Sequence, residues 1–380
     1  MISESTYQAA RMVAPTIETH FAHHIEEAQR AGETELATVP EIHVIESIID
    51  ATFWASLHRE EGHSPRISLA WLPPEQAGNP LVFEQWLPLT PRTLTKLSPG
   101  FERPGIHLGV WHSNGELYVW GATITIPNFC FVLDVSEPGL LVIKHRRMDG
   151  FGKFANVAVL IGEEIKIVDE NSASLPDCPA LLSSLLGFTS PSSWNDTTDV
   201  LVQLAVSMRA HKRGGSLLIV PADSYSWRES IIRPIHYAVA PAFTGLTELM
   251  KVDSEERTHS QWQITLRREV DIIAGLTAID GAIVMSEQYE LLAFGAKIRH
   301  RDGGTLIDQI IVTEPILGGG ATIIDPAQNG GTRHLSAAQF VHDQRDALAL
   351  VASQDGRFTV FSWSPCEGMV HAHRIDSLLL

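Results

Sequence analysis

Three hairpin signals follow one another between residues 108 and 168, and they limit the possible folds of the first half of the chain more than any other feature. Each signal is a pair of short β-prone runs joined by residues that tolerate a tight turn: Asn114-Gly115, Glu137-Pro138-Gly139 and Gly162. Strands joined by tight turns run antiparallel. Together with the helical periodicity that precedes them, these hairpins predict a smaller antiparallel α+β domain over residues 1–172.

The second half of the chain alternates helical and strand patterns. A helix is expected behind the cap-rich Thr197-Thr198-Asp199, and a short buried strand over residues 217–220. Further along come a helix ending near Leu276, a hairpin over 283–294, a helix over 333–345 and a closing hairpin over 348–361. This order predicts an α/β domain over residues 199–380, with a mixed sheet flanked by helices, and an α+β fold for the whole chain. The stretch 173–198 is rich in Ser, Pro, Asn and Asp and is predicted to be a linker.

Composition and charge narrow the classes of function. The 380 residues carry a formal net charge of −17, which argues against nonspecific binding to nucleic acid or to an anionic membrane. No run of eighteen apolar residues and no signal-peptide pattern are found, so we expect a cytoplasmic protein without a membrane span. The three cysteines are few and far apart, which predicts buried thiols rather than disulfides or a metal centre.

The most informative segment for chemistry is Gly330-Gly331-Thr332-Arg333-His334, which opens a predicted helix. The glycines let a ligand approach the backbone, and the start of a helix presents N–H groups that favour an anion. Thr332 is suited to cap the helix or to bind a phosphate, Arg333 to clamp a phosphate, and His334 to add a second donor. The competing interpretation is a glycine turn followed by a capped helix with two solvated side chains.

A second segment, Asp280-Gly281-Ala282, lies where a predicted helix passes into a strand. A carboxylate at this point is suited to accept a hydrogen bond from a ribose hydroxyl or to act as a general base, and the small residues leave room for a base or a sugar. Taken alone, Asp-Gly is more often an ordinary turn.

Both segments together, in this order and between these elements, resemble the diadenylate cyclase domain over about residues 199–365. Those enzymes join two ATP molecules into cyclic di-AMP. The resemblance implies that Asp280, Gly281 and Ala282 contact the adenosine, and that Gly331, Thr332, Arg333 and His334 contact the phosphates. It implies Mg²⁺ or Mn²⁺ only when a nucleoside triphosphate is bound, and a catalytic role for Asp280 only in an active enzyme. A homo-oligomer is a further expectation.

Three departures separate this chain from active cyclases. Ile279 stands where those enzymes usually have a metal-binding His, and Leu335 stands where the second Arg of Arg-His-Arg is expected. The Ser-Glu-Glu near the end is matched by Ser353-Gln354-Asp355, so Ser353 and Asp355 join the predicted nucleotide site with one carboxylate instead of two. Phosphoryl transfer depends on metal and cationic neutralisation of charge. The chain therefore resembles most closely the probable-sensor relatives of the cyclases, the DACNV type.

Three hypotheses follow for the function. The first is a sensor that binds a nucleotide or dinucleotide with little or no turnover, and the second is an active diadenylate cyclase. The third is an interaction domain with an unused pocket. Two histidine groups, His20-His23-His24 and His371-His373, have a spacing compatible with metal binding, but we expect solvated or capping roles for them.

Overall fold

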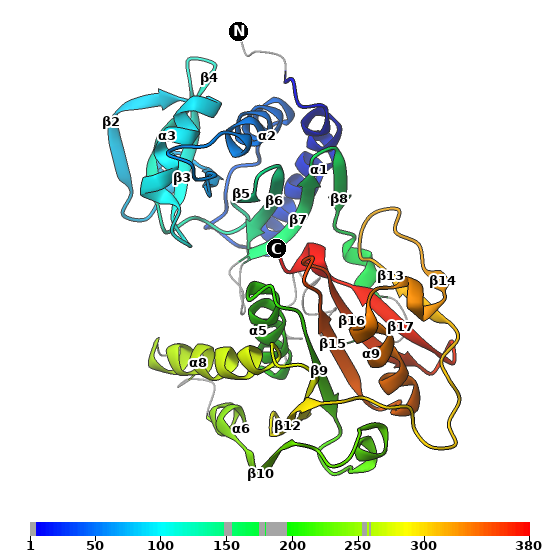
Figure 1. Cartoon of the computed structure of the whole chain (residues 1–380). Coiled ribbons are helices and arrows are strands. Elements are labelled where there is room, and N and C mark those ends of the chain that lie inside the picture. The colour runs from blue at the N-terminus through cyan, green and yellow to red at the C-terminus, as the bar shows by residue number, and fades with distance from the viewer. Residues whose placement is uncertain (1–4, 148–153, 175–178, 180–195, 253–256, 258–259) are drawn as a thin grey trace. The chain divides into compact units, whose positions relative to one another are not determined.

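The structure is a computed structural model that describes residues 5–147, 154–174, 179, 196–252, 257 and 260–380. The chain divides into two compact units, here called the N-terminal unit (Met1–Val168 with Leu380) and the C-terminal unit (Asp169–Leu379). Each unit is built on a mixed sheet accompanied by helices, which confirms the predicted α+β fold (Figure 1). Most of the predicted linker 173–198 lies outside the described residues.

The N-terminal unit is an eight-stranded sheet with the strand order β2-β4-β3-β1-β5-β6-β7-β8. Its elements are α1 (Gln8–Arg30), α2 (Ile42–Leu57), β1 (Ser68–Trp71), β2 (Leu81–Pro88), α3 (Pro91–Phe101), β3 (His107–Ser113), β4 (Glu116–Thr123), β5 (Phe131–Glu137), β6 (Leu140–Arg146), β7 (Phe154–Ile161) and β8 (Glu164–Ile167). The three predicted hairpins are β3–β4, β5–β6 and β7–β8.

One pairing corrects the expectation of a purely antiparallel sheet. Strand β1 pairs parallel with β3 and antiparallel with β5, so the sheet of the N-terminal unit is mixed. The turn signals could not reveal this pairing, because β1 reaches its neighbours through long connections rather than through a tight turn. Helices α1 and α2 pack on one face of the sheet, where Ile17, Ile48 and Phe131 share a core.

The C-terminal unit is a nine-stranded sheet with the order β10-β12-β11-β9-β15-β16-β17-β13-β14. Its elements are α5 (Asp196–Ala210), β9 (Gly215–Val220), β10 (Tyr237–Phe243), α6 (Gly245–Met250), α8 (Ser260–Leu276), β11 (Ala282–Ser286), β12 (Leu291–Ala296), β13 (Ile310–Thr313), β14 (Thr322–Ile324), α9 (Thr332–Asp343), β15 (Leu348–Ala352), β16 (Phe358–Ser364) and β17 (Met369–Arg374). Strand β9 pairs parallel with β11 and β13 pairs parallel with β17, whereas the other neighbours are antiparallel.

Strand β9 shows why this sheet has helices on both faces. All six of its residues are buried, as expected for a central strand covered on each side. Leu217 packs in a core with α5 and α8, while the next residue, Leu218, packs in a second core with α9. Successive side chains of a strand point to opposite faces, so α9 lies on the other face from α5 and α8 (Figure 1).

Element boundaries differ from expectation in three places. Helix α5 begins at Asp196, so Thr197, Thr198 and Asp199 lie inside the helix instead of before it. Helix α9 ends at Asp343 rather than at Arg345. The hairpin β15–β16 does not close the domain, because β17 follows and pairs with β16.

Over the part of the chain that the structure describes, no helix has the length and apolar character needed to cross a membrane. The prediction of buried thiols is confirmed for Cys130 and is wrong for Cys366, which is exposed. Burial raises the pKa of the Cys130 thiol, as expected for a thiol shielded from solvent. Cys178 lies outside the described residues.

Candidate functional site

A cavity of about 570 Å³ in the C-terminal unit brings together the two segments that carry the predicted chemistry. It is named here the motif pocket. The residues that line it are Ser216, Ile232, Asp280, Gly281, Ala282, Ala296, Lys297, Ile298, Gly331, Thr332, Arg333, His334, Ser336, Ala352, Ser353 and Gln354. Asp280-Gly281-Ala282 and Gly331-Thr332-Arg333-His334 are about fifty residues apart in sequence and therefore meet only in the folded sheet.

The sheet topology accounts for this meeting. Strands β9 and β11 are parallel, and Ala282 at the start of β11 is the partner of Ser216 near the start of β9. The antiparallel strand β15 ends at Ala352, beside Gly215. Two strand starts and one strand end therefore lie at the same edge of the sheet, and α9 begins at this edge with Thr332.

Gly281 has a backbone conformation that a side chain would not tolerate. Its φ angle is +122°, in the region that favours glycine. A Cβ at this position would lie 2.4 Å from the carbonyl carbon of Gly295. The absence of a side chain allows the turn after α8 to pack against the end of β12, and this packing places Asp280 at the mouth of the motif pocket.

The start of α9 presents its backbone to the motif pocket. Thr332 is the first helical residue and Gly331 is the N-cap, which makes no side-chain capping hydrogen bond. Thr332 is therefore not the helix cap. The backbone N–H of His334 donates to the Gly331 carbonyl at 3.0 Å, and that of Leu335 donates to the same oxygen at 3.3 Å. Arg333, half-buried, adds its guanidinium to this side of the pocket.

The electrostatics of the motif pocket depend on three side chains besides Arg333. Lys297 follows β12 and forms a hydrogen-bonded ion pair with Asp280. This hydrogen bond and the Lys297 charge lower the pKa of the Asp280 carboxyl below its ordinary value, so Asp280 is ionised at neutral pH. Burial lowers the pKa of His334, which leaves its imidazole neutral at pH 7.

Most predicted site residues line the motif pocket: Asp280, Gly281, Ala282, Gly331, Thr332, Arg333, His334 and Ser353. Asp355 is not among the lining residues, and its carboxylate instead pairs with the Arg357 side chain at 3.5 Å. The pocket is also lined by residues that are not among the predicted site residues: Lys297, Gln354 and the apolar pair Ile232 and Ile298. A basic residue three positions beyond the predicted hairpin strand was the available signal for Lys297, but only the paired strands place it opposite Asp280.

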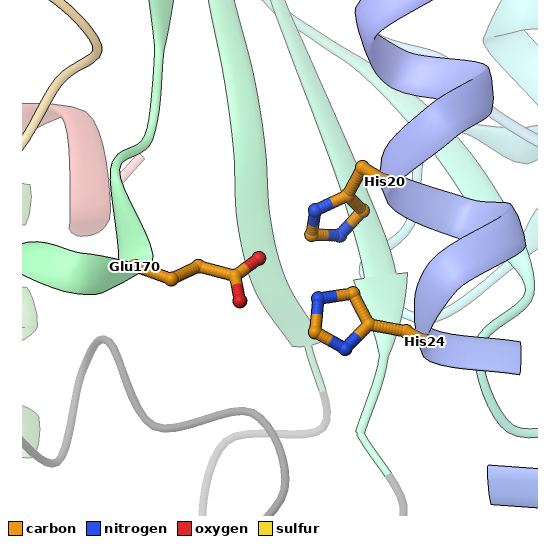
Figure 2. A group of neighbouring side chains, drawn as sticks. All are labelled: His20, His24 and Glu170. Carbon is orange, nitrogen blue, oxygen red and sulfur yellow. The ribbon is translucent and has the colours of Figure 1, made fainter. Parts of the chain in front are cut away.

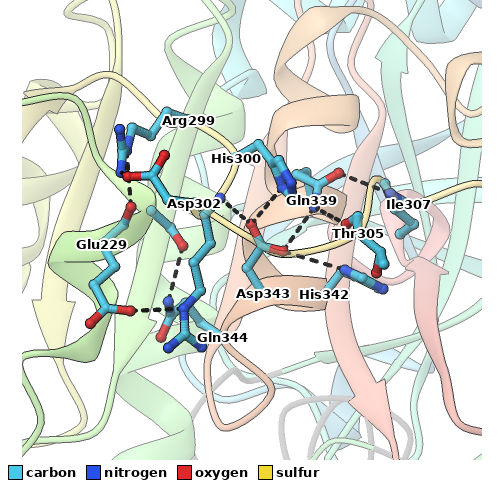
Figure 3. A network of polar contacts seen from close by, with 12 residues as sticks. Glu229, Arg299, His300, Asp302, Thr305, Ile307, Gln339, His342, Asp343 and Gln344 are labelled. Atoms are coloured by element: carbon cyan, nitrogen blue, oxygen red, sulfur yellow. Dashed lines mark hydrogen bonds and ion pairs between the residues drawn. The ribbon is translucent and has the colours of Figure 1, made fainter.

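A buried polar network fixes the chain beyond Lys297. The Asp343 side chain at the end of α9 is only 2% exposed. Its carboxylate accepts hydrogen bonds from the backbone N–H of Arg301 at 2.9 Å and from the Gln339 amide at 2.9 Å. The Nδ1 atoms of His300 and His342 lie 3.3 and 3.4 Å from it (Figure 3). Asp343 thereby ties the segment that follows Lys297 to α9.

This network lies beside a second cavity of about 400 Å³, which is lined in part by Arg301, His342, Asp343 and Arg345. The positive groups there have partners inside the unit: Arg301 pairs with Glu229 at 2.8 Å, and Arg345 lies over the Trp363 ring at 4.0 Å. These contacts support a structural role for the network.

Asp343→Ala is expected to lower the free energy of unfolding by about 2–4 kcal/mol, because four polar groups lose a buried carboxylate. The matched control is Asp302→Ala, which removes an 85% exposed carboxylate from an ion pair with Arg299 and should cost at most about 0.5 kcal/mol. Urea unfolding of both variants measures the difference. Equal effects would contradict the structural role of Asp343.

Each of the two histidine groups contains one residue that differs from the predicted solvated or capping role. His20 and His24 extend from the same side of α1, one turn apart (Figure 2), and His24 is buried while His23 is exposed. His373 on β17 is also buried, and its Nδ1 lies 2.8 Å from the Thr313 hydroxyl. The predictions were wrong for His24 and His373, because spacing along a chain does not say which face the core covers.

Comparisons with known proteins place a family match in the N-terminal unit. Residues 34–124 match the family model of the probable sensor domain DACNV, a stretch that runs from before α2 to just past the end of β4. The match supports a sensor domain in this chain. The motif pocket lies outside the matched stretch, in the C-terminal unit.

No curated protein matches the chain. Eight chains of solved structures do. One of them is described as the crystal structure of the hypothetical membrane spanning protein from Bacillus cereus. It is 13% identical in sequence with a TM-score of 0.28, and the similarity covers 48% of this chain and 65% of that one.

Proposed function

We propose that the C-terminal unit binds an adenine nucleotide or dinucleotide in the motif pocket and acts as a sensor with little or no turnover. The observation that carries the proposal is the convergence of Asp280-Gly281-Ala282 and Gly331-Thr332-Arg333-His334 on one 570 Å³ cavity. A cavity of this size is within the range of small-molecule sites.

The residues that line the pocket are suited to bind both the phosphate and the nucleoside part of such a ligand. The N-terminus of α9, Arg333 and Lys297 are suited to phosphate, because they combine backbone donors with two positive side chains. Ile232, Ile298 and Ala352 are suited to contact a base or a ribose through apolar surface. The Asp280 carboxylate remains an acceptor for a ribose hydroxyl.

The same pocket is poorly equipped for the cyclase reaction. Joining two nucleotides by phosphoryl transfer requires neutralisation of the charge that moves in the transition state. Ile279 and Leu335 provide neither a metal ligand nor a cation, and the Asp280 carboxylate is engaged by Lys297. Binding without efficient turnover is therefore the function that we propose.

Arg333→Ala is expected to weaken ATP or cyclic di-AMP binding by about 10- to 100-fold, because a charged bidentate donor is lost. Isothermal titration of the full chain with each nucleotide measures the effect. Arg268→Ala is the control, since Arg268 is exposed on α8 and does not line the pocket. Wild-type protein that binds no adenine nucleotide at micromolar concentrations would refute the proposal.

Turnover is tested separately by incubating the protein with ATP and Mn²⁺ or Mg²⁺ and separating the nucleotides by chromatography. We expect unchanged ATP. Cyclic di-AMP formed above the level of a His334→Ala variant would make the chain an active diadenylate cyclase instead of a sensor.

A further inference from the structure

We infer that the motif pocket binds the phosphate of its ligand without a divalent cation, and that Lys297 exchanges its ion pair with Asp280 for a pair with that phosphate. The inference rests on the proposed nucleotide-binding function and specifies how the site achieves it. It assigns to one lysine of this chain the charge that a metal ion would otherwise supply.

The donor set of the pocket does not fit a divalent metal. Among the described residues that line the pocket, Asp280 is the only carboxylate, and Lys297 already donates a hydrogen bond to it. Mg²⁺ is held by oxygen ligands and usually by one or two carboxylates. Within the described ranges, no group of three or more His, Cys, Asp or Glu side chains placed to hold a metal lies in this pocket.

The charged side chains that line the motif pocket already give it a net positive charge without a metal. The lining residues include two cations, Lys297 and Arg333, and one anion, Asp280, so that 2 − 1 leaves one net positive charge. The neutral, buried His334 imidazole leaves this sum unchanged at pH 7. A divalent cation at Asp280 would have to displace Lys297 and would then face two positive side chains.

The exchange is energetically accessible because the ion pair is exposed. The Lys297 side chain is 49% exposed and that of Asp280 is 89% exposed. An exposed ion pair contributes little net stability, whereas a charge-assisted hydrogen bond to phosphate in a partly enclosed site contributes more. The Lys297 carbonyl accepts from the Ile232 N–H at 2.8 Å, so the backbone is fixed while the long side chain is free to turn toward a ligand.

The test is isothermal titration of the full chain with ATP, once in EDTA and once in Mg²⁺. We expect Kd values within about threefold of each other, which is less than about 0.7 kcal/mol. Binding that needs Mg²⁺, with at least a tenfold loss in EDTA, would overturn the inference and leave the proposed function intact. Binding in neither buffer would overturn both.

Substitutions of Lys297 test whether this residue supplies the positive charge that binds the phosphate. Lys297→Met should weaken ATP binding in EDTA by about tenfold or more, and Lys297→Arg should retain most of it. Lys251→Met is the matched control, because Lys251 pairs with Glu248 in another exposed ion pair away from the pocket. An unchanged Kd for Lys297→Met would overturn the inference.

Asp280→Asn separates metal-free from metal-dependent binding when its effect on the Kd for ATP is compared in EDTA and in Mg²⁺. If Lys297 supplies the charge, this variant should change the Kd for ATP by the same factor, within about threefold, in EDTA and in Mg²⁺, because Asp280 then holds no metal in either buffer. In a metal-dependent site the same change would remove a ligand of the metal and weaken binding in Mg²⁺. A loss of ATP affinity in Mg²⁺ that is at least tenfold greater than the loss in EDTA would overturn the inference.

Discussion

Gly281→Ala is expected to lower the free energy of unfolding by about 3 kcal/mol or more and to abolish nucleotide binding. The φ angle of +122° strains any side chain, and the new Cβ would lie 2.4 Å from the Gly295 carbonyl carbon, a backbone atom that cannot swing aside. The turn must therefore shift, and Asp280 and Ala282 move with it at the mouth of the motif pocket. Urea unfolding and titration with ATP measure the two effects.

The chain offers a matched control in Gly275→Ala. Gly275 lies inside α8, and a Cβ there would meet no atom within 4 Å. Alanine in a helix should be neutral or stabilising by about 0.5–1 kcal/mol. If Gly281→Ala were as stable as Gly275→Ala, the close approach between the turn and β12 would not exist in solution.

Acidification from pH 7 to pH 5 is expected to destabilise both units through two buried histidines. Burial, assisted by the neighbouring His20, lowers the pKa of His145 to about 3, and burial with His371 nearby lowers the pKa of His373 to about 3. An unfolded histidine has a pKa of about 6.5. The stabilisation is therefore complete above pH 6.5 and is lost as the pH falls from 6.5 toward 3, because the unfolded chain binds the additional protons.

The expected loss is about 2 kcal/mol from each histidine between pH 7 and pH 5, since one pKa unit corresponds to about 1.4 kcal/mol. His373→Gln should reduce the difference in unfolding free energy between these two pH values by about this amount. Comparing two pH values within one variant removes the effect of altered hydrogen bonds. The control is His236→Gln, because His236 is exposed in the same unit. An unaltered pH dependence in His373→Gln would mean that His373 accepts a proton in the folded state.

The local turn and helix signals anticipated much of the secondary structure. The hairpins β3–β4, β5–β6 and β7–β8 each depend on a few adjacent residues, as at Asn114-Gly115, so their signals survive in a single sequence. The parallel placement of β1 beside β3 depends on side chains that lie far apart in the chain. No short window of sequence contains that information.

In the candidate site, too, some features depend on adjacent residues and others depend on residues far apart in the chain. Glycines next to polar side chains are a local feature of the sequence. This feature marks Asp280-Gly281-Ala282 and Gly331-Thr332-Arg333-His334 as candidate ligand-binding segments. The position of Lys297 opposite Asp280, and the absence of Asp355 from the motif pocket, depend on the pairing of strands. The register of β11 against β12 sets the position of Lys297. The course of the chain after β15 keeps Asp355 out of the motif pocket.

Local pattern is enough to predict the hairpins, a helix beginning near Thr332, the α+β class and the two segments proposed to bind a ligand, because each depends on neighbours a few residues away. The three-dimensional fold is needed to show that these segments share one cavity, that Lys297 pairs with Asp280, and that His24 and His373 are buried. These features arise when residues far apart in the chain are packed around a common core, and packing depends on the whole fold rather than on local pattern.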